Sequence, residues 1–230
     1  MRTRLAGTGW LELDDAPEAS VDRRVVVGPP GRWIAIYDQA NEDLDLPRLR
    51  WFLDHLITSG VHGVFVLGTN SEFYAFSESE KQEVIATAVA HVNKRVPVFA
   101  GTGAETTREA IRLTKMAERE GVDGVSVITP YFVLPTQQEI FDHYRRIAES
   151  TSLPVILYSN PATCAGTKIE PETVARLAEI PNILAIKDSS GDLQNTIEMV
   201  RLATRVAATR VQGSPAVPGY AIIGELGTGG

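Results

Sequence analysis

A lysine at the end of an apolar run is the residue whose type and position most strongly suggest chemistry in this sequence. Ile183 to Ile186 form a short apolar run typical of a buried strand, and Lys187 follows it directly. Burial of an ammonium group is costly, so a lysine placed there favours its neutral amine. A neutral amine can attack a ketone carbon and form a Schiff base. A lysine that extends from the strand end into solvent is the alternative interpretation.

A tyrosine ends the preceding apolar run. Tyr158 follows Val155, Ile156 and Leu157, and neighbouring strands of a sheet lie about 4.8 Å apart. The side chains of Tyr158 and Lys187 could therefore meet over one pocket. A phenol beside an amine that becomes an iminium is suited to moving protons. Tyr158 could also be an ordinary core residue.

A polar segment, Gly68 to Glu72, follows another apolar run and precedes a helix signal. Exposed backbone N–H groups at such a position can hold a carboxylate. Thr69 and Asn70 are therefore candidate substrate-binding residues. A turn followed by a helix cap is the alternative interpretation of the same two residues.

The elements that must position these residues repeat along the chain. Apolar runs, the last of them weaker, start near residues 33, 63, 97, 124, 155, 183 and 211, and their spacing of roughly 30 residues is that of a βα unit. Helix starts are indicated between them, because three hydroxyl residues are each followed three positions later by a glutamate. These capping boxes begin at Ser77, Thr106 and Thr136. Gly60 and Gly121 lie where helices should end.

The almost wholly apolar strands indicate a parallel sheet that is buried on both faces. Such a sheet occurs in a (β/α)₈ barrel or in a doubly wound open sheet. No Gly-x-Gly-x-x-Gly motif follows a first strand, and Gly101-Thr102-Gly103 is too short for it or for a phosphate loop. Polar residues instead follow several different strands, which favours the barrel. We predict a (β/α)₈ TIM barrel that is truncated near its eighth strand, since such a barrel usually needs about 250 residues.

Composition limits the classes of protein and the domain organisation. The chain has 230 residues and a formal charge of −7, which offers no basic surface for nucleic acid. No apolar run is long enough for a membrane span, and no apolar segment typical of a signal peptide follows the first arginines. We expect a cytoplasmic protein with an irregular extension over residues 1–30 and one barrel domain over residues 31–230.

A metal or thiol mechanism has weaker support. The four histidines lie on predicted helices or on loops that lead into strands, mostly away from strand C-termini: His55, His62, His91 and His143. The single cysteine, Cys164, has no histidine partner at a strand end. We therefore expect no metal site and no cofactor.

Four segments of the chain resemble motifs of one known family, in the family's order. They are Gly63 to Glu72, Thr129-Pro130-Tyr131-Phe132, Leu157-Tyr158-Ser159-Asn160-Pro161 and Ile186-Lys187-Asp188-Ser189-Ser190-Gly191-Asp192. The family is that of dihydrodipicolinate synthase and N-acetylneuraminate lyase. The resemblance covers roughly residues 42 to 213 and implies a Schiff-base aldolase or dehydratase on a (β/α)₈ barrel.

The resemblance also implies a role for each matching residue. Lys187 would form an imine with the C2 carbonyl of a pyruvate-type 2-oxo acid, and Tyr158 would act as the acid and base. Thr69, together with Asn70, would bind the substrate carboxylate and relay protons to Tyr158. Phe132 and Gly213 would line the substrate pocket. Members of the family are commonly tetramers, which implies a homo-oligomer, a dimer or a tetramer.

Departures from the family pattern bear on the substrate. Dihydrodipicolinate synthases carry a second tyrosine where Phe132 stands, and an arginine after the Tyr-Asn-x-Pro segment binds their substrate's second carboxylate. Residues 162–166 contain no arginine here, so a second carboxylate would be held less well. We therefore expect a lyase for a sugar-derived 2-oxo acid. Dihydrodipicolinate synthase activity and a truncated, non-catalytic family member are the alternatives.

Overall fold

The computed structural model of this chain describes residues 10–11, 25–26, 33–34, 43–211 and 221–224, with side chains for residues 43–69 and 71–203. The chain divides into two compact units. The first contains Met1–Gly101 and Arg119–Asp123, and the second contains Thr102–Glu118 and Gly124–Gly230. Among the described residues, no helix is both long enough and apolar enough to cross a membrane.

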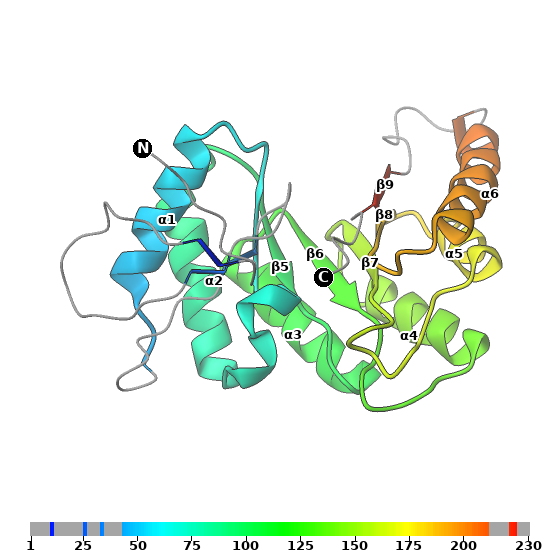
Figure 1. Cartoon of the computed structure of the whole chain (residues 1–230), viewed down its shortest axis with the longest axis horizontal. Helices are drawn as coiled ribbons and strands as arrows, with labels where there is room; N and C mark the ends of the chain where they lie inside the picture. The colour runs from blue at the N-terminus through cyan, green and yellow to red at the C-terminus, as the bar shows by residue number, and fades with distance from the viewer. Residues whose placement is uncertain (1–9, 12–24, 27–32, 35–42, 212–220, 225–230) are drawn as a thin grey trace. The chain divides into compact units, whose positions relative to one another are not determined.

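The first unit contains three parallel strands that pair in chain order. They are β3 (Trp33–Ile34), β4 (Val64–Val66) and β5 (Val98–Gly101). Two helices, α1 (Leu46–Thr58) and α2 (Glu78–Val92), pack against each other (Figure 1). Two short 3₁₀ helices, η1 (Thr69–Ser71) and η2 (Phe73–Ala75), follow β4. The core of this unit is formed by apolar side chains of the strands and of the two helices, and the helices contribute Phe52, Leu53, Leu56, Ile85 and Ala88.

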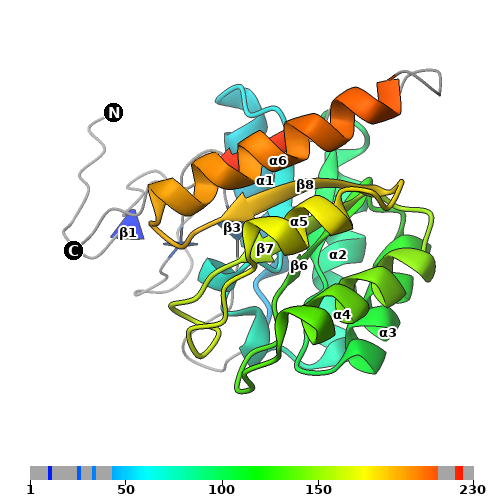
Figure 2. The same ribbon diagram turned by 90° about the vertical axis from the view of Figure 1, so that its right-hand side faces the viewer.

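The second unit contains four parallel strands that also pair in chain order. They are β6 (Gly124–Ile128), β7 (Val155–Ser159), β8 (Ile183–Asp188) and β9 (Ala221–Gly224). Most of α3 (Thr107–Glu120) belongs to this unit, as do α4 (Gln137–Glu149), α5 (Pro171–Leu177) and α6 (Leu193–Val211). Helix α5 packs between α4 and α6, and all three lie on one side of the strands (Figure 2).

The helix boundaries follow the predicted caps. Ser77 and Thr136 each form a complete capping box with the glutamate three residues later. The Thr106 hydroxyl accepts from the Glu109 N–H at 3.2 Å. Gly60 and Gly121 adopt φ values of +84° and +85°, which suit glycine at a helix end. The predicted alternation of strands and helices is confirmed from residue 43 to residue 203.

The prediction of a strand starting near Val211 was wrong, because Val211 is the last residue of α6. The β-branched side chain suggested a strand, but a single valine costs a helix only a few tenths of a kcal/mol. The preceding residues include Ala203, Ala207 and Ala208, which favour continuation of the helix. The next strand is β9, which begins at Ala221 and pairs with β8.

Two short strands lie within the N-terminal segment for which we predicted irregular structure. Strands β1 (Trp10–Leu11) and β2 (Val25–Val26) pair with each other in antiparallel orientation. The other residues of the predicted extension over residues 1–30 lie outside the described residues, so its irregular character stays a prediction.

Candidate active site

Lys187 and Tyr158 lie beside each other in the second unit. They are paired residues in the parallel ladder between β8 and β7, each close to the C-terminal end of its strand. The Lys187 Nζ lies 4.5 Å from the centroid of the Tyr158 ring. Lys187 is only 7% exposed and Tyr158 5% exposed. The structure therefore holds an amine against the face of a phenol in a place with little access to bulk water.

The strand alternation explains why these two side chains share a face. Asp188, the neighbour of Lys187, accepts a 2.7 Å hydrogen bond from Thr196 of α6, so its side chain points to the helix layer. Successive side chains of a strand point to opposite faces, which places Lys187 on the face away from the helices. The Tyr144 hydroxyl of α4 donates to the Val127 carbonyl at 3.0 Å and holds that helix against β6.

Asn160 contributes a contact for which the sequence analysis assigned no role. Its side-chain amide donates to the Tyr158 hydroxyl oxygen over 3.1 Å, and the residue is 9% exposed. Asn160 belongs to the segment that resembles the family's Tyr-Asn-x-Pro motif. The signal that could have found it is its polar character two residues after Tyr158, just beyond the end of β7.

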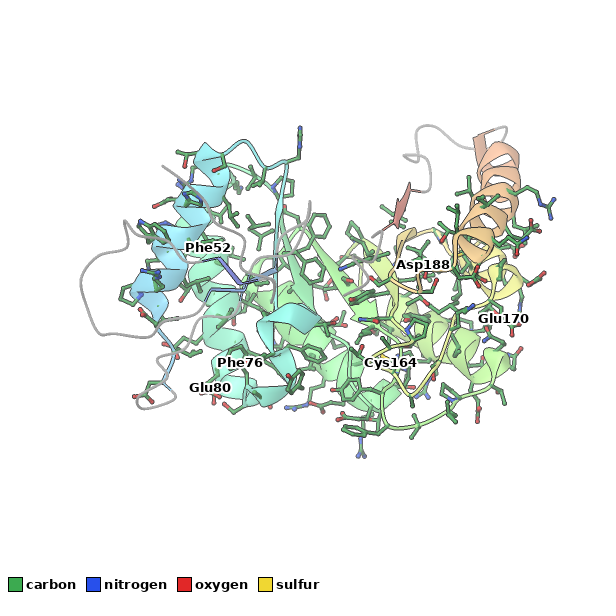
Figure 3. All side chains as sticks on the ribbon, in the orientation of Figure 1. Phe52, Phe76, Glu80, Cys164, Glu170 and Asp188 are labelled. Atoms are coloured by element: carbon green, nitrogen blue, oxygen red, sulfur yellow. The ribbon has the colours of Figure 1, made fainter. Side chains whose placement is uncertain are left out.

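The segment after Lys187 is fixed by a buried carboxylate. Asp188, labelled in Figure 3, is 3% exposed and accepts from the Ser190 N–H at 3.1 Å and the Ser190 hydroxyl at 3.0 Å, besides Thr196. A buried carboxylate needs such donors to offset its lost hydration. Because Asp188 is bonded to Lys187 in the chain, these contacts also restrict the backbone that carries the amine.

An ion pair ties this segment to the chain before α5. The Lys168 Nζ donates to the Asp192 carboxylate at 2.8 Å, and the Asn195 N–H donates to it at 3.0 Å. The Lys168 hydrogen bond, followed by that of the Asn195 N–H, lowers the pKa of Asp192. Both partners are about two-fifths exposed, so the pair contributes little to stability and mainly restricts the two loops.

Thr69 and Asn70 belong to the first unit. They are the first two residues of η1. Leu67, two residues before η1, adopts a left-handed φ of +59°. The Ser71 hydroxyl donates to the Gly68 carbonyl at 2.7 Å, and the Ser71 side chain is fully buried. This hydrogen bond stabilises the turn that carries Thr69. The Asn70 side chain is not among the described side chains.

Phe132 lies in the second unit, in the loop between β6 and α4. Its side chain is 87% exposed and its φ is +66°, a left-handed value that is unusual for an aromatic residue. The ring of Tyr131 lies 5.7 Å away. Burial, followed by the charge of Glu105, raises the pKa of Tyr131, so Tyr131 stays a neutral phenol. Gly213 lies outside the described residues.

The arrangement in the second unit can support amine chemistry. A buried lysine can become a neutral nucleophile, and the adjoining phenol can donate or accept a proton.

The Cys164 thiol, labelled in Figure 3, is buried and contacts the Thr129 carbonyl at 3.5 Å. Burial raises the pKa of Cys164, which makes its thiol a poor nucleophile. Within the described ranges, no group of three or more His, Cys, Asp or Glu residues is placed to hold a metal ion.

Comparison with curated proteins gives relatives named 4-hydroxy-tetrahydrodipicolinate synthase. The 4-hydroxy-tetrahydrodipicolinate synthase of Syntrophus aciditrophicus (strain SB) is 44% identical over 162 residues, which are 70% of this chain and 55% of that protein. The enzyme of the same name from Bacillus velezensis is 44% identical over 158 residues, 69% of this chain and 54% of that protein. The chain spans about half the length of the curated relatives it matches.

Solved structures of similar fold confirm the predicted (β/α)₈ barrel. A dihydrodipicolinate synthase from Bacillus anthracis has a TM-score of 0.73 and 35% identity, over 82% of this chain and 59% of that chain. A prophage protein of the dihydrodipicolinic acid synthase family from E. coli K12, solved in complex with pyruvate, has a TM-score of 0.74 and 31% identity. That match covers 86% of this chain and 63% of the other.

The family model agrees with these relatives. The model described as "Dihydrodipicolinate synthetase family" matches residues 33–208, a range that contains Thr69, Phe132, Tyr158 and Lys187. The family that we inferred from four short motifs is therefore confirmed over most of the chain. The chain belongs to the dihydrodipicolinate synthetase family.

Proposed function

We propose that this chain is part of a lyase that forms a Schiff base between Lys187 and a pyruvate-type 2-oxo acid. The observation that carries the proposal is the buried Lys187 amine, held 4.5 Å from the centroid of the Tyr158 ring at the ends of paired strands. The E. coli prophage relative, which was solved with pyruvate, supports the class of substrate.

The chemistry begins with attack of the Lys187 amine on the C2 carbonyl carbon of the oxo acid. The resulting carbinolamine loses one water, and an iminium forms between C2 and the lysine nitrogen. Loss of a proton from C3 then gives an enamine, which can add to an aldehyde. Run in reverse, the same enamine forms when a carbon–carbon bond breaks. Tyr158 would give and take these protons.

The other candidate residues would bind the substrate. Thr69, with Asn70, would hold the carboxylate of the oxo acid through the turn that opens η1, and Thr69 would relay protons. Phe132 and Gly213 would line the pocket. These roles rest on the resemblance of their segments to the family motifs, and Lys187 and Tyr158 alone carry the proposed bond-forming step.

The second substrate separates two candidate activities. The names of the relatives support a 4-hydroxy-tetrahydrodipicolinate synthase, and this is our first candidate. The second candidate is a lyase for a sugar-derived 2-oxo acid. It is favoured by one feature of the sequence, since residues 162–166 contain no arginine to bind a second carboxylate.

Product analysis distinguishes the two candidates. The chain is supplied with pyruvate and the co-substrate of the named relatives, or with a panel of sugar-derived 2-oxo acids, and products are identified by mass spectrometry. Formation of 4-hydroxy-tetrahydrodipicolinate supports the first candidate, whereas turnover of the sugar acids alone supports the second. The Lys187→Ala variant should be inactive in both arms. Turnover by that variant would contradict the proposal.

A homo-oligomer, a dimer or a tetramer, remains our proposal for the assembly. Three consecutive apolar side chains of the loop between β6 and α4 are exposed, and such a patch favours association. They are Phe132, Val133 and Leu134. One solved relative is a monomeric dihydrodipicolinate synthase variant. Sedimentation analysis of this chain tests the proposal, and a monomer would contradict it.

A further inference from the structure

The phenol oxygen of Tyr158 receives a hydrogen bond from a neighbour on its own chain segment. The Asn160 side-chain amide donates to it over 3.1 Å, and both residues are at least nine-tenths buried. A hydrogen bond is stronger in such surroundings than in water, and each buried polar group needs a partner. The hydrogen bond is therefore part of the packed interior around Tyr158 and is not an incidental surface contact.

The backbone on both sides of Asn160 is held in place. The Ser159 carbonyl accepts from the Ser189 N–H at 2.8 Å, which joins this segment to the residues just beyond Lys187. The Asn160 carbonyl accepts from the Thr163 N–H at 3.2 Å and closes a turn. Asn160 thus has little freedom to move away from the phenol.

The direction of this hydrogen bond restricts the phenol proton. A phenol has one proton, and its oxygen accepts from Asn160, so the O–H bond must point away from the amide. A donor to the oxygen also stabilises the phenolate that remains after the proton leaves. The Lys187 Nζ, 4.5 Å from the ring centroid, adds a favourable electrostatic contact to the same ring when it is protonated.

We propose that Asn160 is a positioning residue that orients the Tyr158 hydroxyl and eases the loss of its proton. The inference rests on the proposed acid–base role of Tyr158 and adds a residue to which nothing in the family resemblance assigned a function. Asn160 acts through Tyr158, and no contact between Asn160 and a substrate is needed.

The direct test follows Tyr158 itself by NMR in protein labelled with ¹³Cζ-tyrosine. The Tyr158→Phe variant identifies its resonance among the six tyrosines of the chain. In Asn160→Leu, which has similar volume but no donor, the pH at the midpoint of the Tyr158 titration should rise by about one unit. In Asn160→Asp it should rise at least as far, since a carboxylate cannot donate and repels a phenolate.

A matched control alters the same turn without touching the phenol. The Thr163 hydroxyl lies 3.4 Å from the Asn160 carbonyl, and Thr163→Val should leave the Tyr158 midpoint at the wild-type pH. Unchanged midpoints in both Asn160 variants would overturn the inference. An equal shift in Thr163→Val would do the same, because the effect would then belong to the turn and not to the amide.

A second measurement connects the contact to catalysis. Exchange of the pyruvate C3 protons with deuterated water reports proton transfer, and trapping with borohydride reports imine formation. Asn160→Leu should slow the exchange about tenfold and leave trapping within about twofold. If wild-type protein forms no adduct, the proposed function fails while the NMR titration still decides the Asn160 contact. If wild-type protein forms the adduct and Asn160→Leu exchanges at the wild-type rate, the positioning role is refuted.

Discussion

Lys187 is held on its face of β8 by the residues on either side of it. Ile186 is fully buried, and Asp188 bonds to Thr196 on the helix side of the strand. A shift of one residue in the register of β8 would place Lys187 in the helix layer, where the Asp188 contacts would also be lost. The position of the amine therefore depends on an ordinary strand register that polar contacts reinforce.

Replacement of Tyr158 by phenylalanine tests the proton transfer at this site. Tyr158→Phe keeps the ring that packs beside Lys187 and removes the hydroxyl. We expect turnover to fall by about 10²- to 10⁴-fold, the range typical of a general acid or base. Trapping of the imine with borohydride should be slowed but not eliminated, because the amine remains. Thr69→Val should show a milder loss of turnover, since it removes a relay and leaves the phenol.

Steady-state kinetics and trapping on the same preparations give the decisive comparison. Turnover of Tyr158→Phe close to that of wild type would exclude the acid–base role. Tyr158 would then be a core residue that supports β7 and no more.

A buried histidine makes the second unit sensitive to acid. His143 of α4 is 4% exposed, and its Nδ1 lies 2.9 Å from the Thr107 hydroxyl oxygen at the start of α3. Among the residues that the structure describes, none forms a hydrogen bond with the buried Nε2. Burial, followed by the nearby charge of Arg146, lowers the pKa of His143 to about 4. The imidazole is therefore neutral in the folded protein at physiological pH.

The resulting pH dependence has a definite sign. The unfolded chain protonates this histidine near pH 6.5, whereas the folded chain does so only near pH 4. Between these values the unfolded state binds more protons, so the free energy of unfolding falls as the pH falls. The loss attributable to His143 should reach about 3 kcal/mol at pH 4. Urea unfolding of wild type and His143→Leu should show a steeper pH dependence for wild type, and parallel curves would contradict this assignment.

At the scale of the elements, the two glycines of Gly101-Thr102-Gly103, a segment too short for a phosphate loop, lie where neighbouring atoms leave no room for a side chain. In the first unit, a Cβ on Gly101 would lie 1.9 Å from the Leu67 carbonyl oxygen. In the second unit, a Cβ on Gly103 would lie 2.5 Å from the Ile128 Cγ2 and 2.9 Å from the Ile128 backbone nitrogen. Glycine at each position lets backbone segments approach closely beside the strand ends.

Gly103→Ala should therefore destabilise the protein by about 1–3 kcal/mol, the usual cost of overpacking a buried site. Gly63→Ala is a suitable control, because the nearest atom to a Cβ there is the Pro97 carbonyl oxygen at 3.4 Å and the backbone φ is not positive. Its effect should stay below about 1 kcal/mol. Chemical denaturation measures both changes, and equal stability of the two variants would show that Gly103 has room for a side chain.

Most helices and strands could be predicted because their signals are local. A capping box or a glycine at a helix end acts within a few residues, and the structure has these signals at Ser77, Thr136, Gly60 and Gly121. The prediction of a strand near Val211 was wrong because the β-branched signal there is weak and a helix that began at Leu193 continues through it. Competition between neighbouring segments is not visible in a short window of sequence.

At the scale of the whole molecule, the family and its barrel were predictable because four motifs occur in a fixed order. The contacts within the candidate site were less accessible. The pairing of Tyr158 with Lys187 follows from strand order, but the Asn160 hydrogen bond depends on how the chain turns after β7. The contacts of Asp188 with Ser190 and Thr196 likewise depend on the path of the loop into α6, which no local pattern specifies.

The measurement that tests the central claim most directly is reduction with borohydride in the presence of pyruvate, followed by peptide mapping with mass spectrometry. We predict one stable adduct, located at Lys187. Lys187→Ala should lack it, and Lys187→Arg should lack it too, because a guanidinium stays protonated and cannot attack a carbonyl. An adduct on Lys168 or Lys94, or none on Lys187 in folded protein, would contradict the assignment of Lys187 as the Schiff-base residue.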